Sequence, residues 1–256
     1  MSFNKPFFCA IISLLLSCDN KIQVHKIEGQ NLAVDTQSKA DKNIEDFIAP
    51  YKKKLEASEN EMYRKLSYSP KVLSKKEGYL NTAIGNMMAD AVFELCNPLF
   101  KDKTNQPLNM VMLNHGGIRA ILPKGEITAN TAFSIMPFEN SVVVVALSGK
   151  TIKNELLKYL VEEQTAHPIS GLEIKLNSDN SINYARINGN EILPQKTYYV
   201  ATSDYLLNGG DRMNFFAKNK SVHNLHYKIR SLLIDYFKIK DTLRPTTDKR
   251  FTKSNS

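Results

Sequence analysis

One run of residues limits the folds open to this chain more than any other. Ser141-Val-Val-Val-Val-Ala-Leu147 is continuously apolar after its serine and is rich in β-branched residues. A strand with one face in water would alternate apolar and polar residues, so this run predicts a strand buried on both faces. The chain must therefore supply packed layers on both sides of a sheet.

Helical and strand patterns are interspersed along the rest of the chain. Apolar spacing predicts helices over 43–65 with Pro50 kinking or restarting the helix, over 84–95 with a stop at Cys96-Asn97-Pro98, over 149–163, and over 222–237. Strands are predicted at 110–113, 172–176 and 198–203, with a type I′ hairpin at Asn188-Gly189 joining 184–187 to 191–193. Because these elements do not follow a regular βαβ order, the predicted fold class is α+β, a mixed β-sheet layered with helices.

Composition excludes several classes of protein. Of the 256 residues, 42% are hydrophobic and 23% are charged, which is typical of a globular chain and excludes a fibrous or disordered one. The formal net charge is +8, but the lysines are spread along the sequence rather than gathered with aromatic residues. This pattern favours attraction to anionic lipid or substrate and predicts no nucleic-acid partner. Three cysteines cannot form a disulfide framework, and Cys96 is expected to be a small buried residue within a helix.

The N-terminus has the features of an export signal. Lys5 precedes an apolar stretch from Phe7 to Leu16, and Leu15-Leu16-Ser17-Cys18 resembles a bacterial lipobox, whose cysteine is lipidated. We therefore expect a lipoprotein signal peptide at 1–17, lipidation of Cys18, a flexible polar tether at 18–42 and a folded domain at 43–250. The expected location is the bacterial cell envelope, with the protein exported and attached to a membrane through its lipid anchor. A plain signal peptide cleaved elsewhere is the alternative.

Two glycine pairs mark candidate binding loops. The first is Asn114-His115-Gly116-Gly117-Ile118-Arg119, and the second is Tyr205-Leu206-Leu207-Asn208-Gly209-Gly210-Asp211. Each pair follows a predicted strand, and paired glycines let the backbone approach a ligand closely. An arginine guanidinium can donate paired hydrogen bonds to a phosphate or a carbonyl group, and an aspartate carboxylate can accept hydrogen bonds from hydroxyl groups. Two tight turns without a ligand are the alternative that the pattern alone leaves open.

Together with their neighbours, these loops resemble a known family. The chain from about residue 65 to 241 is similar to the C-terminal domain of bacterial and animal 5′-nucleotidases. The likeness is carried by five blocks in the family's order: 84–90, 114–128, 133–149, 169–172 and 199–211. The resemblance implies the fold of that domain and a nucleotide or nucleoside ligand.

The resemblance also implies a role for each site residue. Phe138 and Tyr205 would clamp the base between two rings, each partly exposed without ligand. Asn114 would contact the base edge, Asp211 would hold ribose hydroxyls, and Arg119 would reach the phosphate. The remaining expected site residues form the glycine turns: Gly116, Gly117, Asn208, Gly209 and Gly210. Two departures stand out, since Tyr205 replaces the family's usual phenylalanine and residues 77–82 lack the arginine often found there.

The sequence predicts no catalytic residues in this chain. Full-length 5′-nucleotidases carry a metallophosphoesterase domain whose Asp-x-His, Gly-Asp-x-x-Asp and Gly-Asn-His-Glu motifs hold two metals, and these motifs do not occur here. His223 and His226 are expected one turn apart on the last helix without a completing carboxylate, so no metal site and no cofactor is predicted for this chain. His115 lies in the first glycine turn, where it either stabilises the turn or contacts phosphate.

Three functional hypotheses follow. The first is a lipid-anchored recognition subunit of a split 5′-nucleotidase, whose divalent metals reside on a separate metallophosphoesterase protein. The second is a surface lipoprotein that binds nucleotides or nucleosides without catalysis. The third is a structural lipoprotein that has lost the pocket, and the joint presence of the five residues with implied ligand contacts argues against it.

Overall fold

The computed structural model describes residues 26, 28–31 and 39–254, and it divides into two compact units, Met1–Pro50 and Tyr51–Ser256. The expected signal peptide and Cys18 lie outside the described residues. Helix α2 (Lys42–Tyr63) begins where Asp41 Oδ1 accepts the backbone N–H of Asn43 at 2.8 Å. The helix runs through Pro50 and buries none of its residues.

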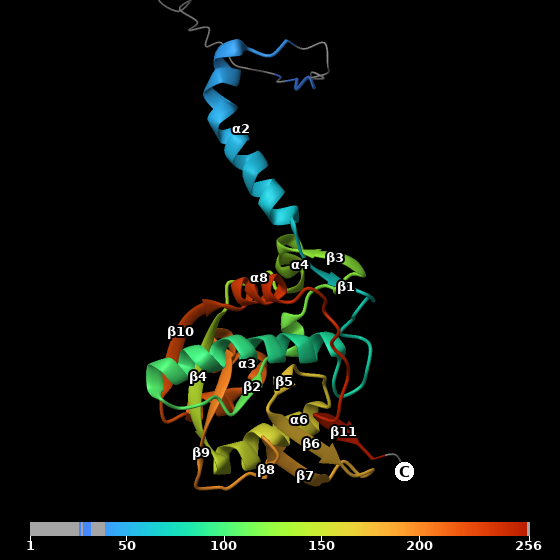
Figure 1. The fold of residues 1–256 in the computed structure, drawn as a ribbon, viewed down its shortest axis with the longest axis vertical. Helices are drawn as coiled ribbons and strands as arrows, with labels where there is room; N and C mark the ends of the chain where they lie inside the picture. The colour runs from blue at the N-terminus through green and yellow to red at the C-terminus, as the bar shows by residue number, and fades with distance from the viewer. Residues whose placement is uncertain (1–25, 27, 32–38, 255–256) are drawn as a thin grey trace, which may run out of the picture. The chain divides into compact units, whose positions relative to one another are not determined.

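The described residues of the larger unit form three β-sheets, whose strands are labelled in Figure 1. The first sheet pairs β1 (Lys65–Ser69) with β3 (Gly125–Thr128). The second has the strand order β10 (Val222–Lys228), β4 (Ser141–Ser148), β9 (Thr197–Ser203), β2 (Met110–Met112) and β5 (Ile169–Ser170). The third has the strand order β11 (Phe251–Lys253), β6 (Leu172–Leu176), β7 (Ile182–Ile187) and β8 (Asn190–Glu191). The helices are α3 (Ala83–Thr104), α4 (Ala129–Ile135), α5 (Gly149–Thr151), α6 (Leu157–Glu163), α7 (Asp204–Leu207) and α8 (Ile229–Ile239). Shorter helical turns are η2 (His115–Gly117), η3 (Ile152–Leu156), η4 (Gly210–Arg212) and η5 (Asn214–Lys218). The α+β prediction is confirmed.

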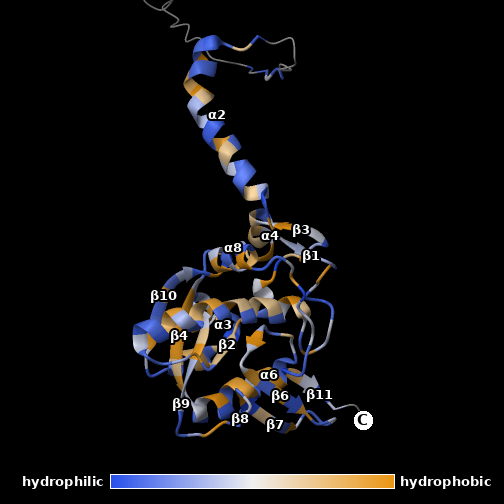
Figure 2. Ribbon diagram, viewed as in Figure 1, coloured by the Kyte–Doolittle hydropathy of each residue, from blue (hydrophilic) through white to orange (hydrophobic). Residues whose placement is uncertain are grey.

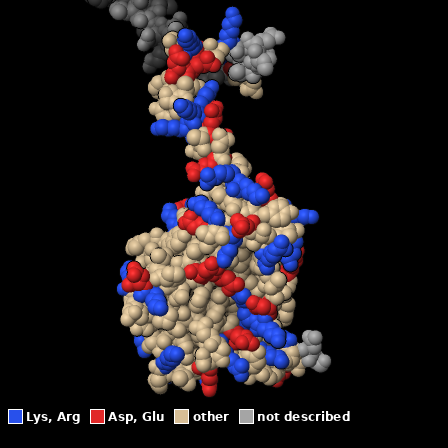
Figure 3. Space-filling view, in the orientation of Figure 1, with Lys and Arg blue, Asp and Glu red and all other residues tan. Residues whose placement is uncertain are grey.

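Strand β4 separates two hydrophobic cores. Val142 and Val144 pack with α3 and α8, whereas Val145 and Leu147 face the core formed with η3, α6 and the β11–β6–β7–β8 sheet. Alternate residues of one strand therefore enter different cores, which explains why the run is apolar at consecutive positions. Figure 2 shows hydrophobic residues, in orange, along the strands in the middle of the larger unit. On the face drawn in Figure 3, Lys and Arg are interspersed with Asp and Glu among a larger number of uncharged residues.

Helix α3 extends beyond its predicted end. The prediction of a stop at Cys96-Asn97-Pro98 is wrong, because α3 continues through Pro98 to Thr104 and ends where Asn105 adopts left-handed backbone angles (φ 56°). Phe100, which is fully buried, packs into the first core and holds this extra length in place. Cys96 is also fully buried, as expected, and burial raises the pKa of its thiol to about 12.

The predicted helix over 222–237 is only half correct. Residues 222–228 form the edge strand β10, paired antiparallel with β4, and α8 begins at Ile229. His223, Leu225 and Tyr227 are half-buried while the residues between them are exposed, a period of two that belongs to a strand. His223 and His226 therefore do not share a helix face, and His226 has a positive φ of 53°.

The hairpin and the remaining predicted strands are confirmed. Asn188 and Gly189 both have positive φ (49° and 76°), as a type I′ turn requires, and join β7 to β8. Strands β1, β3 and β11 and helix α4 were not predicted, because they are short and carry few apolar residues in a clear period.

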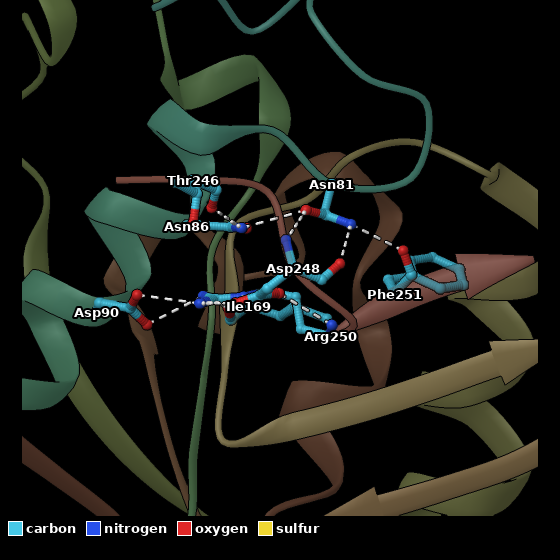
Figure 4. A network of polar contacts seen from close by, with 8 residues as sticks. All are labelled: Asn81, Asn86, Asp90, Ile169, Thr246, Asp248, Arg250 and Phe251. Carbon is cyan, nitrogen blue, oxygen red and sulfur yellow. Dashed lines mark hydrogen bonds and ion pairs between the residues drawn. The ribbon is translucent and has the colours of Figure 1, made fainter. Parts of the chain in front are cut away.

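A polar network ties the C-terminal segment to helix α3 (Figure 4). Arg250 donates two hydrogen bonds to the Asp90 carboxylate at 2.9 and 3.0 Å and one to the carbonyl of Ile169 at 2.7 Å. Beside it, Asn81 donates to the carbonyls of Asp248 and Phe251. Strand β11, which pairs in parallel with β6, is thereby held against the domain beyond the expected boundary at residue 250.

Candidate functional site

The predicted site residues converge on one pocket. Its volume is about 240 Å³, and its lining consists of Asn114, Gly116, Gly117, Arg119, Met136, Phe138, Asn140, Tyr205 and Asp211. The other three expected residues, Asn208, Gly209 and Gly210, line an adjoining depression that shares Asn140 and Tyr205 with the pocket. A larger, more open depression of about 600 Å³ lies beside the C-terminal segment and contains none of the predicted residues.

Strand register brings Phe138 and Tyr205 together although they are distant in sequence. Strands β4 and β9 are antiparallel, with Val142 opposite Ser203, so the residues that precede β4 and those that follow β9 emerge at the same place. Phe138 comes from the first of these segments and is 40% exposed, and Tyr205 comes from the second and is 45% exposed. The expectation of partly exposed rings is confirmed.

The first glycine loop reaches the pocket through a parallel strand pair. Met110 of β2 lies beside Val200 of β9, so the carboxyl ends of both strands meet at one edge of the sheet. Asn114, which follows β2, donates from Nδ2 to Asp211 Oδ2 at 2.8 Å and so joins the two loops.

Asp204 holds the two ring-bearing segments in register. Its Oδ1 accepts from Asn140 Nδ2 at 3.0 Å and from the backbone N–H of Tyr205 at 2.8 Å, while Oδ2 accepts from the backbone N–H of Ser141 at 3.1 Å. A single half-buried carboxylate thus fixes where α7 begins relative to the segment carrying Phe138.

The second glycine pair is required by close packing. A Cβ on Gly210 would lie 2.4 Å from the Tyr205 ring, and Gly209 has a φ of 86° that favours glycine. In the first loop, a Cβ on Gly117 would lie 2.9 Å from Asn114 Oδ1. These glycines let a ring and an amide lie directly against the backbone.

Asp211 is bound on both carboxylate oxygens. In addition to the bond from Asn114, Oδ1 accepts from the Tyr205 hydroxyl at 2.9 Å, and this hydrogen bond raises the pKa of Tyr205 above its ordinary value. Asp211 and Arg212 both have positive φ (50° and 61°), a strained conformation for residues other than glycine. The hydroxyl of Tyr159 supports this turn by donating to the Asp211 carbonyl at 3.0 Å.

One cationic side chain, Arg119, lines the pocket, and a second, Lys75, lies against the first glycine loop. The guanidinium of Arg119 lies 5.9 Å from the centre of the Phe138 ring. Lys75 donates to the carbonyl of His115 at 3.4 Å, and its pKa is lowered by burial and by the charges of Arg119 and Lys76. Neighbouring like charges favour a bound anion, so the side of the pocket lined by Arg119 suits a phosphate group.

His115 does not line the pocket but belongs to the support of its first loop. Its Nδ1 donates to the carbonyl of Ala166 at 3.2 Å, and its backbone N–H donates to Nδ1 of His167 at 3.2 Å. His167 is 5% exposed, and burial followed by the charge of His115 lowers its pKa to about 4. The neutral ring of His167 therefore acts as the acceptor that anchors this loop.

The buried imidazole predicts a loss of stability in mild acid. An unfolded histidine takes up a proton near pH 6.5, whereas folded His167 does so only near pH 4, so the unfolded state binds more protons between these values. Stability from this group is complete above about pH 6.5 and falls by about 2 kcal/mol between pH 7 and pH 5. Urea denaturation at both pH values measures the change.

Two variants test whether His167 causes this pH dependence. His167→Asn keeps a hydrogen-bond acceptor but has no group that takes up a proton, and His226→Asn is the control at an exposed position. His167→Asn should flatten the dependence of stability on pH, while His226→Asn should leave it as in the unsubstituted protein. An equal fall in stability with and without His167 would contradict the assignment.

Sequence reasoning did not single out four residues of the site: Lys75, Met136, Asn140 and Asp204. Met136 and Asn140 stand within the 133–149 block, but the family resemblance implies no role for either of them. Asp204 directly precedes Tyr205 and was a detectable polar neighbour. Lys75 has no sequence signal, because its contact with the carbonyl of His115 in the first glycine loop depends on the fold of the segment 70–82.

Fold and site together define an α+β domain whose strand-end loops form a small pocket with two rings, a carboxylate and a cationic side. The family described as "5′-nucleotidase, C-terminal domain" matches residues 65–218. The chain therefore belongs to the 5′-nucleotidase C-terminal domain family, and its recognition from the sequence blocks is confirmed.

The chain is also similar in sequence to parts of several longer proteins. The chain is 27% identical over 222 residues to the trifunctional nucleotide phosphoesterase protein YfkN of Bacillus subtilis, covering 80% of this chain and 15% of that protein. It is 27% identical over 179 residues to an apyrase of Tabanus yao (60% of this chain, 31% of that protein) and 31% identical over 162 residues to the cell wall protein Lmo0130 of Listeria monocytogenes (58% and 20%). The chain thus spans less than a third of each of these relatives.

The fold of this chain is similar to part of a solved structure. The 5′-nucleotidase precursor from Thermus thermophilus superposes with a TM-score of 0.65 at 21% identity, covering 83% of this chain and 43% of that one. This likeness concerns the fold alone.

Proposed function

We propose that this protein recognises the base and ribose of a nucleotide for a 5′-nucleotidase-type phosphohydrolase in nucleotide catabolism. The observation that carries the proposal is the convergence of two exposed rings, Asp211, Asn114 and Arg119 on one pocket. The rings suit a flat base, the carboxylate suits hydroxyls, and the cationic side suits phosphate. Relatives named nucleotide phosphoesterase and apyrase support the same ligand class.

Hydrolysis is assigned to a separate metallophosphoesterase polypeptide. The site contains carboxylates and amides but no nucleophile with an activating base, and within the described residues no three His, Cys, Asp or Glu side chains are grouped to hold a metal ion. A phosphatase of this type would draw its attacking water and its charge stabilisation from metals on the partner.

Purified protein tests the proposal through binding and turnover. Calorimetric titration with nucleoside 5′-monophosphates should give a measurable dissociation constant, and phosphate release should stay at background with added divalent metal. Adding a metallophosphoesterase that lacks its own C-terminal domain should then give hydrolysis. Hydrolysis by this chain alone, abolished by Phe138→Ala, would overturn the division of labour.

A second candidate function is nucleotide or nucleoside capture without catalysis. The same pocket supports it, and binding that no metallophosphoesterase converts into turnover would select it.

We further propose export and lipid anchoring at Cys18. The lipobox-like sequence and the relative named as a cell wall protein support this location. No helix among the described residues is long and apolar enough to cross a membrane. Replacing Cys18 with alanine should abolish incorporation of a labelled fatty acid, and unchanged labelling would exclude this anchor.

A further inference from the structure

The Tyr205 hydroxyl does more than complete an aromatic ring. It donates to Asp211 Oδ1, while Asn114 donates to Oδ2, so each oxygen of one carboxylate is held by a donor from a different loop. Stacking on a base requires only the ring, so the hydroxyl has a separate role in this pocket.

The ring of Tyr205 and the carboxylate of Asp211 form one rigid unit. Gly210 lies against the ring so closely that no Cβ would fit, which fixes the ring beside the turn that carries Asp211. That turn has two consecutive residues with positive φ, Asp211 and Arg212, and it is held by the bond from Tyr159 to the Asp211 carbonyl. Strain of this kind persists where surrounding contacts over-determine the conformation.

The carboxylate retains acceptor capacity for a ligand. An ionised carboxylate has about four acceptor positions and donates none, so with one bond on each oxygen it can accept one more on each. The complementary ligand group is a pair of neighbouring donors, and the vicinal hydroxyls of a ribose have that form. Asp211 lines the same pocket as Phe138, so a base between the rings would place its sugar near this carboxylate.

We propose that the Tyr205 hydroxyl is a specificity-determining, positioning group that orients Asp211 to accept the 2′,3′-diol of a ribonucleotide, and so makes the pocket prefer ribonucleotides to 2′-deoxyribonucleotides. The inference rests on the proposed nucleotide-binding function and names its substrate class. The hydroxyl acts through Asp211 rather than on the ligand.

The test compares each ribonucleoside 5′-monophosphate with its 2′-deoxy counterpart by calorimetric titration. A hydrogen bond to a charged group contributes enough for the unsubstituted protein to prefer the ribonucleotide about tenfold. Tyr205→Phe keeps the ring and removes the donor, so ribonucleotide affinity should fall about fivefold while deoxyribonucleotide affinity changes less than twofold. In an Asp211→Asn background, Tyr205→Phe should have no further effect on the ratio of the two affinities.

Tyr184→Phe is the matched control. Tyr184 lies on β7, away from the pocket, and its hydroxyl donates to Oε1 of Glu173 on β6 at 2.6 Å. The variant therefore loses the same kind of bond and should keep the tenfold preference. The 45% exposure of Tyr205 and retention of its ring keep the fold of Tyr205→Phe intact, which circular dichroism checks.

Each other outcome has a definite meaning. Equal weakening of both sugars by Tyr205→Phe, or no ribose preference in the unsubstituted protein, overturns the positioning role and leaves the proposed function standing. Failure of every nucleotide to bind the unsubstituted protein overturns the proposed function and this inference together.

Discussion

Phe138→Ala is expected to weaken nucleotide binding by about 1–3 kcal/mol, roughly fivefold to more than a hundredfold, while leaving the free energy of unfolding nearly unchanged. The ring is 40% exposed and lines the pocket, so truncating it removes little packed contact with the core. Titration calorimetry gives the loss of affinity, and urea denaturation gives the stability of the same sample.

Two control variants separate the possible causes. Phe133→Ala removes a ring of similar exposure, 37%, that stacks under Arg230 at 4.2 Å outside the pocket, so it should leave affinity unchanged. Phe100→Ala removes a fully buried ring and should cost about 3–5 kcal/mol of stability. A stability loss of that size for Phe138→Ala, with unchanged affinity, would assign Phe138 to the core and refute the pocket.

The contrast between these rings shows what the sequence could and could not reveal. Phe100 and Phe138 are the same residue type, and neither periodicity nor composition distinguishes their environments. Resemblance to a family placed Phe138 in a site, whereas the burial of Phe100 became visible only when α3 was seen to continue through Pro98. The prediction failed there because packing against the core outweighed the local preference of proline to end a helix.

Strand pairing was the part of the site that sequence patterns could not supply. The two glycine loops were found from their composition, but their contact depends on β2 lying parallel to β9 and on β4 lying antiparallel to it. Such pairings join residues far apart in sequence and leave no local periodic signal. For the same reason, the supporting contacts of Asp204 and Lys75 emerged only with the fold.

Arg250→Met is expected to lower the free energy of unfolding by about 3 kcal/mol. Its side chain is 14% exposed and bonds to Asp90, Asp248 and the carbonyl of Ile169. The substitution therefore removes a largely buried guanidinium from its ion pairs and leaves that carbonyl without its donor. The expected loss of stability is at the lower end of the range for breaking a buried ion pair, because the carboxylates of Asp90 and Asp248 are both more than 40% exposed to solvent.

Arg250 also links stability to the site, because Ile169 belongs to β5, the strand beside β2, which precedes the Asn114 loop. Urea denaturation of Arg250→Met should therefore show a lowered midpoint, with Arg244→Met at an exposed position of the same segment unchanged. Arg250→Lys keeps the charge but loses the two-pronged bond to Asp90, so its midpoint should lie between those of Arg250→Met and the unsubstituted protein. If all three variants unfold at the same urea concentration as the unsubstituted protein, the C-terminal segment does not contribute to holding the domain together.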